Sequence, residues 1–117
     1  MAREIKFRAW DKTNKRFWYQ FDVSSLYGSI YFSGLRKDDW ELNQYTGLHD
    51  KNGKEIYEED VIKMDNMLFI VTYLNDSFLG KAQGNHYRYT IGEHYSFYPY
   101  SDVVIVGTIY ENPELLK

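Results

Sequence analysis

The sequence contains no cysteine among its 117 residues. Disulfide bridges, thiolate zinc sites and cysteine nucleophiles are therefore excluded, and the absence fits a reducing cytoplasm. The chain also has no run of about 18 apolar residues, and Met1 does not begin a charged and then apolar leader. We therefore expect a soluble intracellular protein that does not enter a membrane.

Signatures of the common enzyme classes are missing as well. The sequence has no phosphate-binding P-loop, no dinucleotide-binding fingerprint after a strand, no HExxH pair and no serine in a nucleophile elbow. We predict that the protein is not an enzyme and needs no cofactor or metal ion. One alternative stays open, an acidic or histidine site that loops bring together from Glu58, Asp60, His86, Glu93 and His94.

Aromatic residues are abundant, at 19% of the chain with 12 tyrosines. Tyrosine, phenylalanine and tryptophan favour strands, and a half-exposed tyrosine covers a small sheet well. The surplus therefore favours an aromatic-rich β core, while a stacking surface for bases or for a partner protein is the alternative.

Charge is distributed unevenly around a formal net charge of −3. Residues 1–16 carry six basic side chains against two acidic ones, whereas residues 37–60 carry eight acidic side chains against three lysines. The basic end and the acidic middle can complement each other within the fold or between subunits. The basic end can also face a nucleic acid.

Alternating apolar and polar residues predict about six to eight short antiparallel strands in one compact all-β domain over residues 1–117. The segment Glu58–Tyr73 is reminiscent of small SH3-like barrels, by analogy of fold alone. Asn112 before Pro113 predicts a short helical turn at the C-terminus. We expect Phe78–Tyr100 to hold one irregular strand near Tyr87–Ile91 and a long loop, and we predict that this region is variable or binds a ligand.

The sharpest turn signal is Asn52-Gly53, which suits a two-residue type I′ hairpin because both central residues need a positive φ. The three acidic residues Glu58, Glu59 and Asp60 follow the next predicted strand. Neighbouring carboxylates repel one another, so we expect an exposed turn there rather than a metal site.

Three segments carry a resemblance to a known family: Arg3–Asp11 (REIKFRAWD), Gln44–Asp60 (QYTGLHDKNGKEIYEED) and Gly107–Leu116 (GTIYENPELL). In this order, and over nearly the whole chain, they are similar to the pattern of the YopX family, small proteins of phages and prophages of Gram-positive bacteria. The resemblance implies a β-rich domain of phage origin in the host cytoplasm, and it implies no known reaction. Glu59 stands where the family usually has glycine, so a positive φ there would strain this residue.

The N-terminal hairpin is the best candidate for a binding surface. If its two strands align their faces, Arg8, Trp10, Arg16 and Trp18 share the outer one. Nucleic-acid bases stack on such rings and guanidinium planes, while a sheet decorated by cation–π pairs is the alternative. The full candidate surface consists of Arg3, Lys6, Arg8, Trp10, Arg16 and Trp18.

We therefore predict an accessory protein that binds a host or phage protein, because tyrosine and tryptophan are common at interfaces. Nucleic-acid binding through the N-terminal hairpin is the alternative function. Exposed sheet edges also favour a homo-oligomer.

Overall fold

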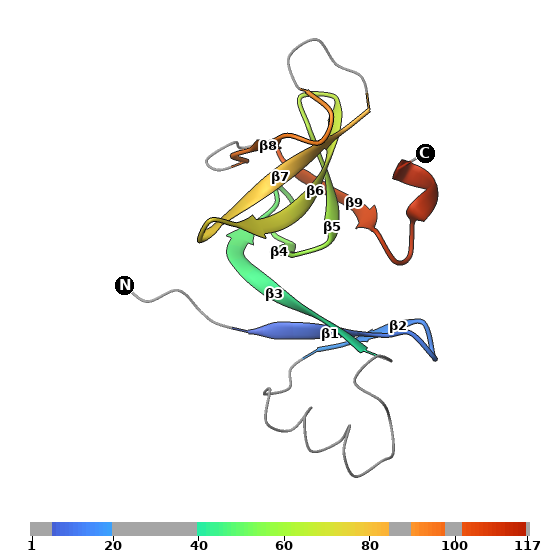
Figure 1. Cartoon of the computed structure of the whole chain (residues 1–117). Helices are drawn as coiled ribbons and strands as arrows, with labels where there is room; N and C mark the ends of the chain where they lie inside the picture. The colour runs from blue at the N-terminus through green and yellow to red at the C-terminus, as the bar shows by residue number, and fades with distance from the viewer. Residues whose placement is uncertain (1–5, 20–39, 85–89, 98–101, 117) are drawn as a thin grey trace. The chain divides into compact units, whose positions relative to one another are not determined.

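The computed structural model describes residues 6–19, 40–84, 90–97 and 102–116, and it confirms the predicted all-β fold (Figure 1). Nine strands and one 3-10 helix are described, against six to eight strands predicted; β4 and β8 have only three and two residues. The elements are β1 (Phe7–Asp11), β2 (Arg16–Trp18), β3 (Trp40–His49), β4 (Glu55–Tyr57), β5 (Asp60–Met64), β6 (Met67–Leu74), β7 (Ser77–Gln83), β8 (His94–Tyr95), β9 (Val104–Thr108) and η2 (Pro113–Leu116).

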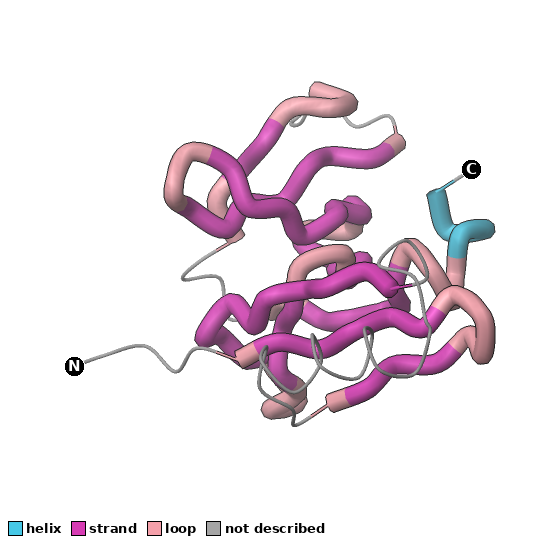
Figure 2. The backbone as a smooth tube through the Cα atoms, turned by 60° about the horizontal axis from the view of Figure 1, so that its bottom comes forward, coloured by secondary structure: helices cyan, strands magenta, loops and turns pink. Residues whose placement is uncertain are grey.

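The chain divides into two compact units, residues 1–45 and residues 46–117. The single domain predicted over residues 1–117 stays a prediction. In the first unit, β1 pairs antiparallel with β2 on one side and with β3 on the other, and both views show β1 and β2 side by side (Figure 1, Figure 2). A polar turn joins β1 to β2, with the amide of Lys15 donating to the carbonyl of Asp11 at 2.8 Å.

β3 changes partner along its length at a glycine. Phe7 pairs with Gln44 in the β1–β3 register, and β4 is the next neighbour of β3 in the sheet order. Between these regions Gly47 has a φ of 86°, a conformation that costs glycine little. The Thr46 hydroxyl donates to the carbonyl of Ile56 at 2.8 Å and accepts the amide of Leu48 at 3.1 Å. This side chain therefore links β3 beside Gly47 to the backbone of β4.

The second unit holds a five-stranded antiparallel sheet in the order β8-β7-β6-β5-β9, curled into a half-barrel (Figure 1). A register shift between Val61 and Ile62 in the β5–β9 pair adds curvature, since a bulge bends the strand that carries it. The loop predicted within Phe78–Tyr100 is wrong in part, because Ser77–Gln83 forms the regular strand β7. Residues 85–89 and 98–100 of that region lie outside the described residues.

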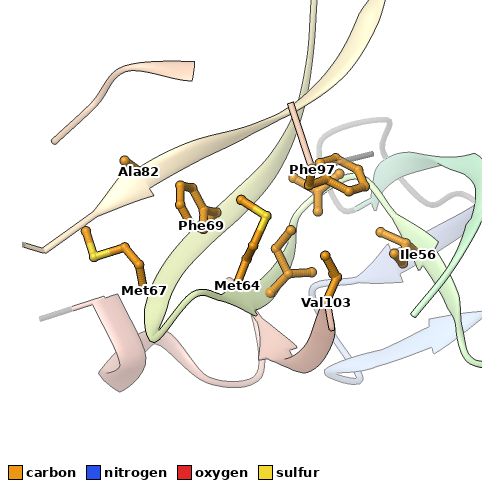
Figure 3. Packing of buried hydrophobic residues seen from close by; sticks show 9 residues of the cluster. Ile56, Met64, Met67, Phe69, Ala82, Phe97 and Val103 are labelled. Atoms are coloured by element: carbon orange, nitrogen blue, oxygen red, sulfur yellow. The ribbon is translucent and has the colours of Figure 1, made fainter. Parts of the chain in front are cut away.

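One hydrophobic core fills the concave side of this sheet. Phe69 and Met64 lie near its centre, with Phe97 and Val103 beside Met64 (Figure 3). Fully burying a side chain of this size contributes about 1.5–3 kcal/mol to stability. The complete cluster consists of Ile56, Ile62, Met64, Met67, Phe69, Val71, Ala82, Phe97 and Val103.

The hairpin turns differ from the prediction in an instructive way. The type I′ turn predicted at Asn52-Gly53 is wrong, because only Gly53 has a positive φ, at 83°. The amide of Gly53 donates to the carbonyl of Asp50, so a type I-like turn is followed by a left-handed glycine. The two-residue turns with positive φ at both positions are Asp65-Asn66 and Asn75-Asp76. Asparagine and aspartate tolerate this region without glycine.

The turn between β4 and β5 confirms that Glu59 adopts a positive φ, at 71°. Its amide donates to the carbonyl of Val71, and its carbonyl accepts the amide of Ile109. The backbone is thus held in place on both sides, and the side chain must accept the left-handed conformation.

Replacing Glu59 with glycine is expected to raise the free energy of unfolding by about 1 kcal/mol, because glycine removes the steric cost of the left-handed region. Urea denaturation measures the change. Glu58→Gly is the matched control: its φ is not positive, so this substitution should lower stability by about 0.5–1 kcal/mol. Equal losses in both variants would show that Glu59 carries no strain.

Candidate functional site

The strand register divides the predicted binding surface between the two faces of the N-terminal sheet. Trp10 pairs with Phe17, whereas Arg16 pairs with Asp11 and Trp18 pairs with Ala9. Paired residues point to the same face, and neighbouring residues in a strand point to opposite faces. The prediction that Arg8 and Trp10 share a face with Arg16 and Trp18 is therefore wrong. Arg3 lies outside the described residues.

The face that holds Arg8 and Trp10 is largely closed to solvent. Arg8 is only 4% exposed, its Nε donates to Oδ1 of Asn43 at 3.0 Å, and its guanidinium lies 4.1 Å from the ring centre of Phe17. Trp10 is also buried and meets the same ring edge-to-face, with 4.8 Å between centroids. Arg8 thus acts within the fold, and its charge is not presented to a phosphate group.

The opposite face is an exposed aromatic surface, which we name the tryptophan face; it consists of Arg16, Trp18, Trp40 and Leu42. Trp18 is 44% and Leu42 43% exposed. Ala9 of β1 pairs with both, so a small, fully buried residue separates the two large side chains. Trp18 and Trp40 meet edge-to-face, with centroids 5.6 Å apart. Large exposed apolar side chains gathered in this way are typical of a contact surface.

Arg16 lies over the same indole. Its guanidinium carbon is 4.7 Å from the centre of the Trp18 ring, within the range of a cation–π contact. Lys12 forms an ion pair with Glu41, with 3.4 Å between Nζ and Oε1. Within the ranges that the structure describes, Arg16 has no ion-pair partner. The tryptophan face therefore combines apolar area with a guanidinium group that lies opposite Asp11 in the register and forms no ion pair among the described residues.

Asp11 anchors the face from the turn between β1 and β2. Its carboxylate accepts hydrogen bonds from the amides of Thr13 and Asn14 and from the side chains of Asn14 and Trp18. Burial by itself raises the pKa of Asp11, but these hydrogen bonds outweigh it and hold the pKa below its ordinary value of about 3.8. The ionised carboxylate thus helps to orient the Trp18 indole.

Trp40 contributes an unusual group, a buried indole Nε1–H without an acceptor in the described part of the chain. A buried donor without a partner costs about 1–3 kcal/mol, so such groups are rare in folded proteins. Trp40 and Leu42 were absent from the predicted surface. Only the β1–β3 register reveals their position, because nothing local in the sequence shows that residues 40–44 pair with residues 7–11.

The alternative acidic and histidine site does not assemble among the residues that can be placed. Asp60 is buried at the start of β5 and accepts the amide of Tyr57 at 2.8 Å. Glu93 accepts the hydroxyl of Tyr95 at 3.0 Å. His86 lies outside the described residues. In the described ranges no three histidine, cysteine or acidic side chains gather in a way that would hold a metal ion.

Two further features of the described residues bear on function. An open depression of about 550 Å³ lies against β5 and β9, lined by Lys51, Lys63, Asp65, Asn66, Asp102, Val104 and Val106. Its charged side chains are exposed and of both signs, so the depression does not favour a ligand of either charge.

The described part of the chain contains no helix with the length and apolar character needed to cross a membrane.

Comparisons with known proteins agree with this architecture. The crystal structure of protein EF1440 from Enterococcus faecalis matches with a TM-score of 0.67 over 99% of this chain and 100% of that chain, at 21% sequence identity, which shows a shared fold. The comparison with curated proteins gives no match. The family model of the YopX protein matches residues 6–117. Because that match covers almost the whole chain, the protein belongs to the YopX family.

Proposed function

We propose that this YopX protein is a non-enzymatic binding module, an accessory protein of a phage or prophage that binds a host or phage protein in the host cytoplasm. The observation that carries the proposal is the tryptophan face, where Trp18 and Leu42 keep 44% and 43% of their surface exposed. Tryptophan and arginine are enriched among the residues that dominate binding energy at protein interfaces. The face is also preorganised, because Asp11 and Trp40 both contact Trp18.

The test is a pull-down in which the tagged protein captures its partner from cells that carry the phage or prophage. The double variant Trp18→Ala, Leu42→Ser is expected to retain at least tenfold less partner than the native protein, since truncating a tryptophan that dominates an interface costs about 2 kcal/mol or more. Circular dichroism of both proteins must show the same β spectrum.

Tyr73→Ser is the matched control. Tyr73 is 42% exposed, much as Trp18 and Leu42 are, but it belongs to β6 in the second unit. This variant is expected to capture as much partner as the native protein. If the control loses the partner and the double variant keeps it, the tryptophan face is not the binding surface.

Nucleic-acid binding is the second candidate, and one observation favours it: a guanidinium group lies over an exposed indole at Arg16 and Trp18. Such a pair stacks a base and neutralises a phosphate. The burial of Arg8 removes one of the cations on which the alternative depended.

A homo-oligomer through the same face is also proposed. Light scattering of the native protein and of the double variant measures the oligomeric state.

A further inference from the structure

We infer that the tryptophan face takes an extended acidic segment of a partner protein, in which a carboxylate side chain and an apolar side chain stand two residues apart. The inference rests on the proposed function and names the chemistry of the partner. It starts from the positions of Arg16 and Trp18, which are the first and third residues of β2. The first and third residues of a strand share a face and lie about 6.6 Å apart. An extended partner segment repeats the same spacing.

The cation on this face is available for a carboxylate. Five basic side chains stand against two acidic ones in the described part of the first unit. The Asp11 carboxylate is occupied by its four hydrogen bonds, and Glu41 pairs with Lys12. Asp11 lies opposite Arg16 in the strand register, but among the described residues it forms no ion pair with Arg16, so the guanidinium N–H groups stay available.

Stacking on Trp18 also orients that cation. The guanidinium carbon lies 4.7 Å from the centre of the ring, and a guanidinium group binds a carboxylate through two parallel N–H hydrogen bonds in its own plane. The arrangement also leaves less side-chain freedom to be lost on binding, since the arginine is already held by the ring. Arg16 therefore matches the acidic position of the segment.

The apolar position of the segment matches the area between Trp18 and Leu42. Both side chains are more than 40% exposed, and the small side chain of Ala9 lies between them in the strand register. A leucine or an aromatic residue placed there removes apolar surface of both partners from water, which is favourable in proportion to the area buried. Charge and shape thus point to one kind of segment.

A single-stranded nucleic acid fits this face less well. Each nucleotide adds a phosphate, whereas an acidic segment brings one or two carboxylates to Arg16. Binding of an oligonucleotide is the competing outcome that the experiment below distinguishes.

The experiment titrates the full-length protein with capped seven-residue peptides and follows tryptophan fluorescence. The probe is Glu-Ser-Leu-Ser-Glu-Ser-Leu, acetylated and amidated. Its comparison peptides replace both glutamates with glutamine, or move glutamate next to leucine. A ten-nucleotide oligothymidylate is titrated in parallel. The probe is expected to bind about tenfold more tightly than the glutamine peptide, because a charged pair with arginine is replaced by a neutral contact.

Arg16→Gln is expected to abolish that tenfold preference, so that the glutamate and glutamine peptides bind with equal affinity. Lys81→Gln is the matched control, since it removes an exposed positive charge from β7 in the second unit. It should keep the preference. Circular dichroism confirms that both variants are folded.

Several results would overturn the inference. Equal affinity for the glutamate and glutamine peptides, or a preference that survives Arg16→Gln, removes the role of the carboxylate. Tighter binding of oligothymidylate that Arg16→Gln weakens assigns the face to nucleic acid instead. If no peptide binds but the pull-down partner depends on Trp18 and Leu42, the inference fails while the proposed function stands. If the pull-down also ignores these residues, both fail.

Discussion

Replacing Asp50 with asparagine is expected to lower the free energy of unfolding by about 3 kcal/mol. Asp50 is only 7% exposed, and its Oδ1 accepts the amides of Asn52 and Lys54 at 2.9 Å, which closes the turn after β3. Its Oδ2 accepts the amide of Ile105 at 3.1 Å and so ties this turn to β9. In the variant an NH₂ group must replace one of the two oxygens, and a buried donor then faces a donor. Urea denaturation at pH 7 measures the loss.

The effect of Asp50→Asn also depends on pH. Burial by itself raises the pKa of Asp50, but the hydrogen bonds, that of Ile105 first, and the positive charge of Lys54 lower it below its ordinary value of about 3.8. A carboxyl with a lowered folded-state pKa contributes stability that is present above its unfolded pKa and is lost as pH falls through the folded value. The native protein should therefore lose stability below about pH 4, and the variant should lose less of it there.

Asp102→Asn is the control for charge. Asp102 is exposed, and the same substitution there should change stability by less than about 0.5 kcal/mol. A loss at Asp102 as large as at Asp50 would mean that net charge, not the hydrogen bonds of the turn, controls stability. Unchanged acid sensitivity in Asp50→Asn would place the titrating group elsewhere, and Asp11 would be the next carboxyl to test, because its pKa is lowered too.

Replacing Gly107 with alanine is expected to cost about 2 kcal/mol, through overpacking at the end of β9. A Cβ atom at this position would lie 2.4 Å from Oδ1 and 2.9 Å from Cβ of Asn112. Asn112 cannot easily move away, because two hydrogen bonds hold it to Thr108. Its Oδ1 accepts the backbone amide of Thr108, and its backbone amide donates to the carbonyl of Thr108. Chemical denaturation of the variant measures the cost.

A double-mutant cycle isolates the contact between Gly107 and Asn112. Asn112→Gly removes the side chain that an alanine would meet, at the cost of the hydrogen bond to Thr108. In that background Gly107→Ala should cost at least 1 kcal/mol less than in the native protein, since the clash is gone. An equal cost in both backgrounds would show that the backbone at Gly107, and not Asn112, excludes a side chain.

Asp50 and Asn112 belong to the second and third segments that carry the family pattern, and both have a structural role. The Asp50 carboxylate joins the turn after β3 to β9, 55 residues later in the chain. The end of β9 is closed by Asn112, with the amide of Glu111 donating to the Thr108 hydroxyl at 3.0 Å. Residues in the second and third motifs of the chain are thus used for hydrogen bonds within the fold. They contribute to stability, whereas the tryptophan face is the surface that we propose for a partner.

Local sequence was sufficient for the class of fold and for most strands. Alternating apolar residues place β1, and the continuous apolar run Leu68–Leu74 places β6, because such patterns depend only on neighbours in the chain. The 3-10 helix at Pro113–Leu116 confirms the short helical turn that Asn112-Pro113 predicts. The positive φ of Glu59 also followed from the family pattern, since glycine marks such a position.

Register and long-range pairing decided the rest. Whether Trp18 points to the same side as Trp10 depends on which residues of β1 and β2 are paired, and a shift of one residue exchanges the faces. Trp40 and Leu42 joined the candidate surface only because β3 pairs with β1 across an intervening segment of the chain. The turn at Asn52-Gly53 was set by the Asp50 carboxylate, which captures the amides of Asn52 and Lys54 and favours a three-residue loop. For the tryptophan face the deciding interactions join strands whose pairing the tertiary structure creates, so a pattern of neighbouring residues does not contain them. The turn was decided locally, by a competing side-chain hydrogen bond that the Asn-Gly signal does not show.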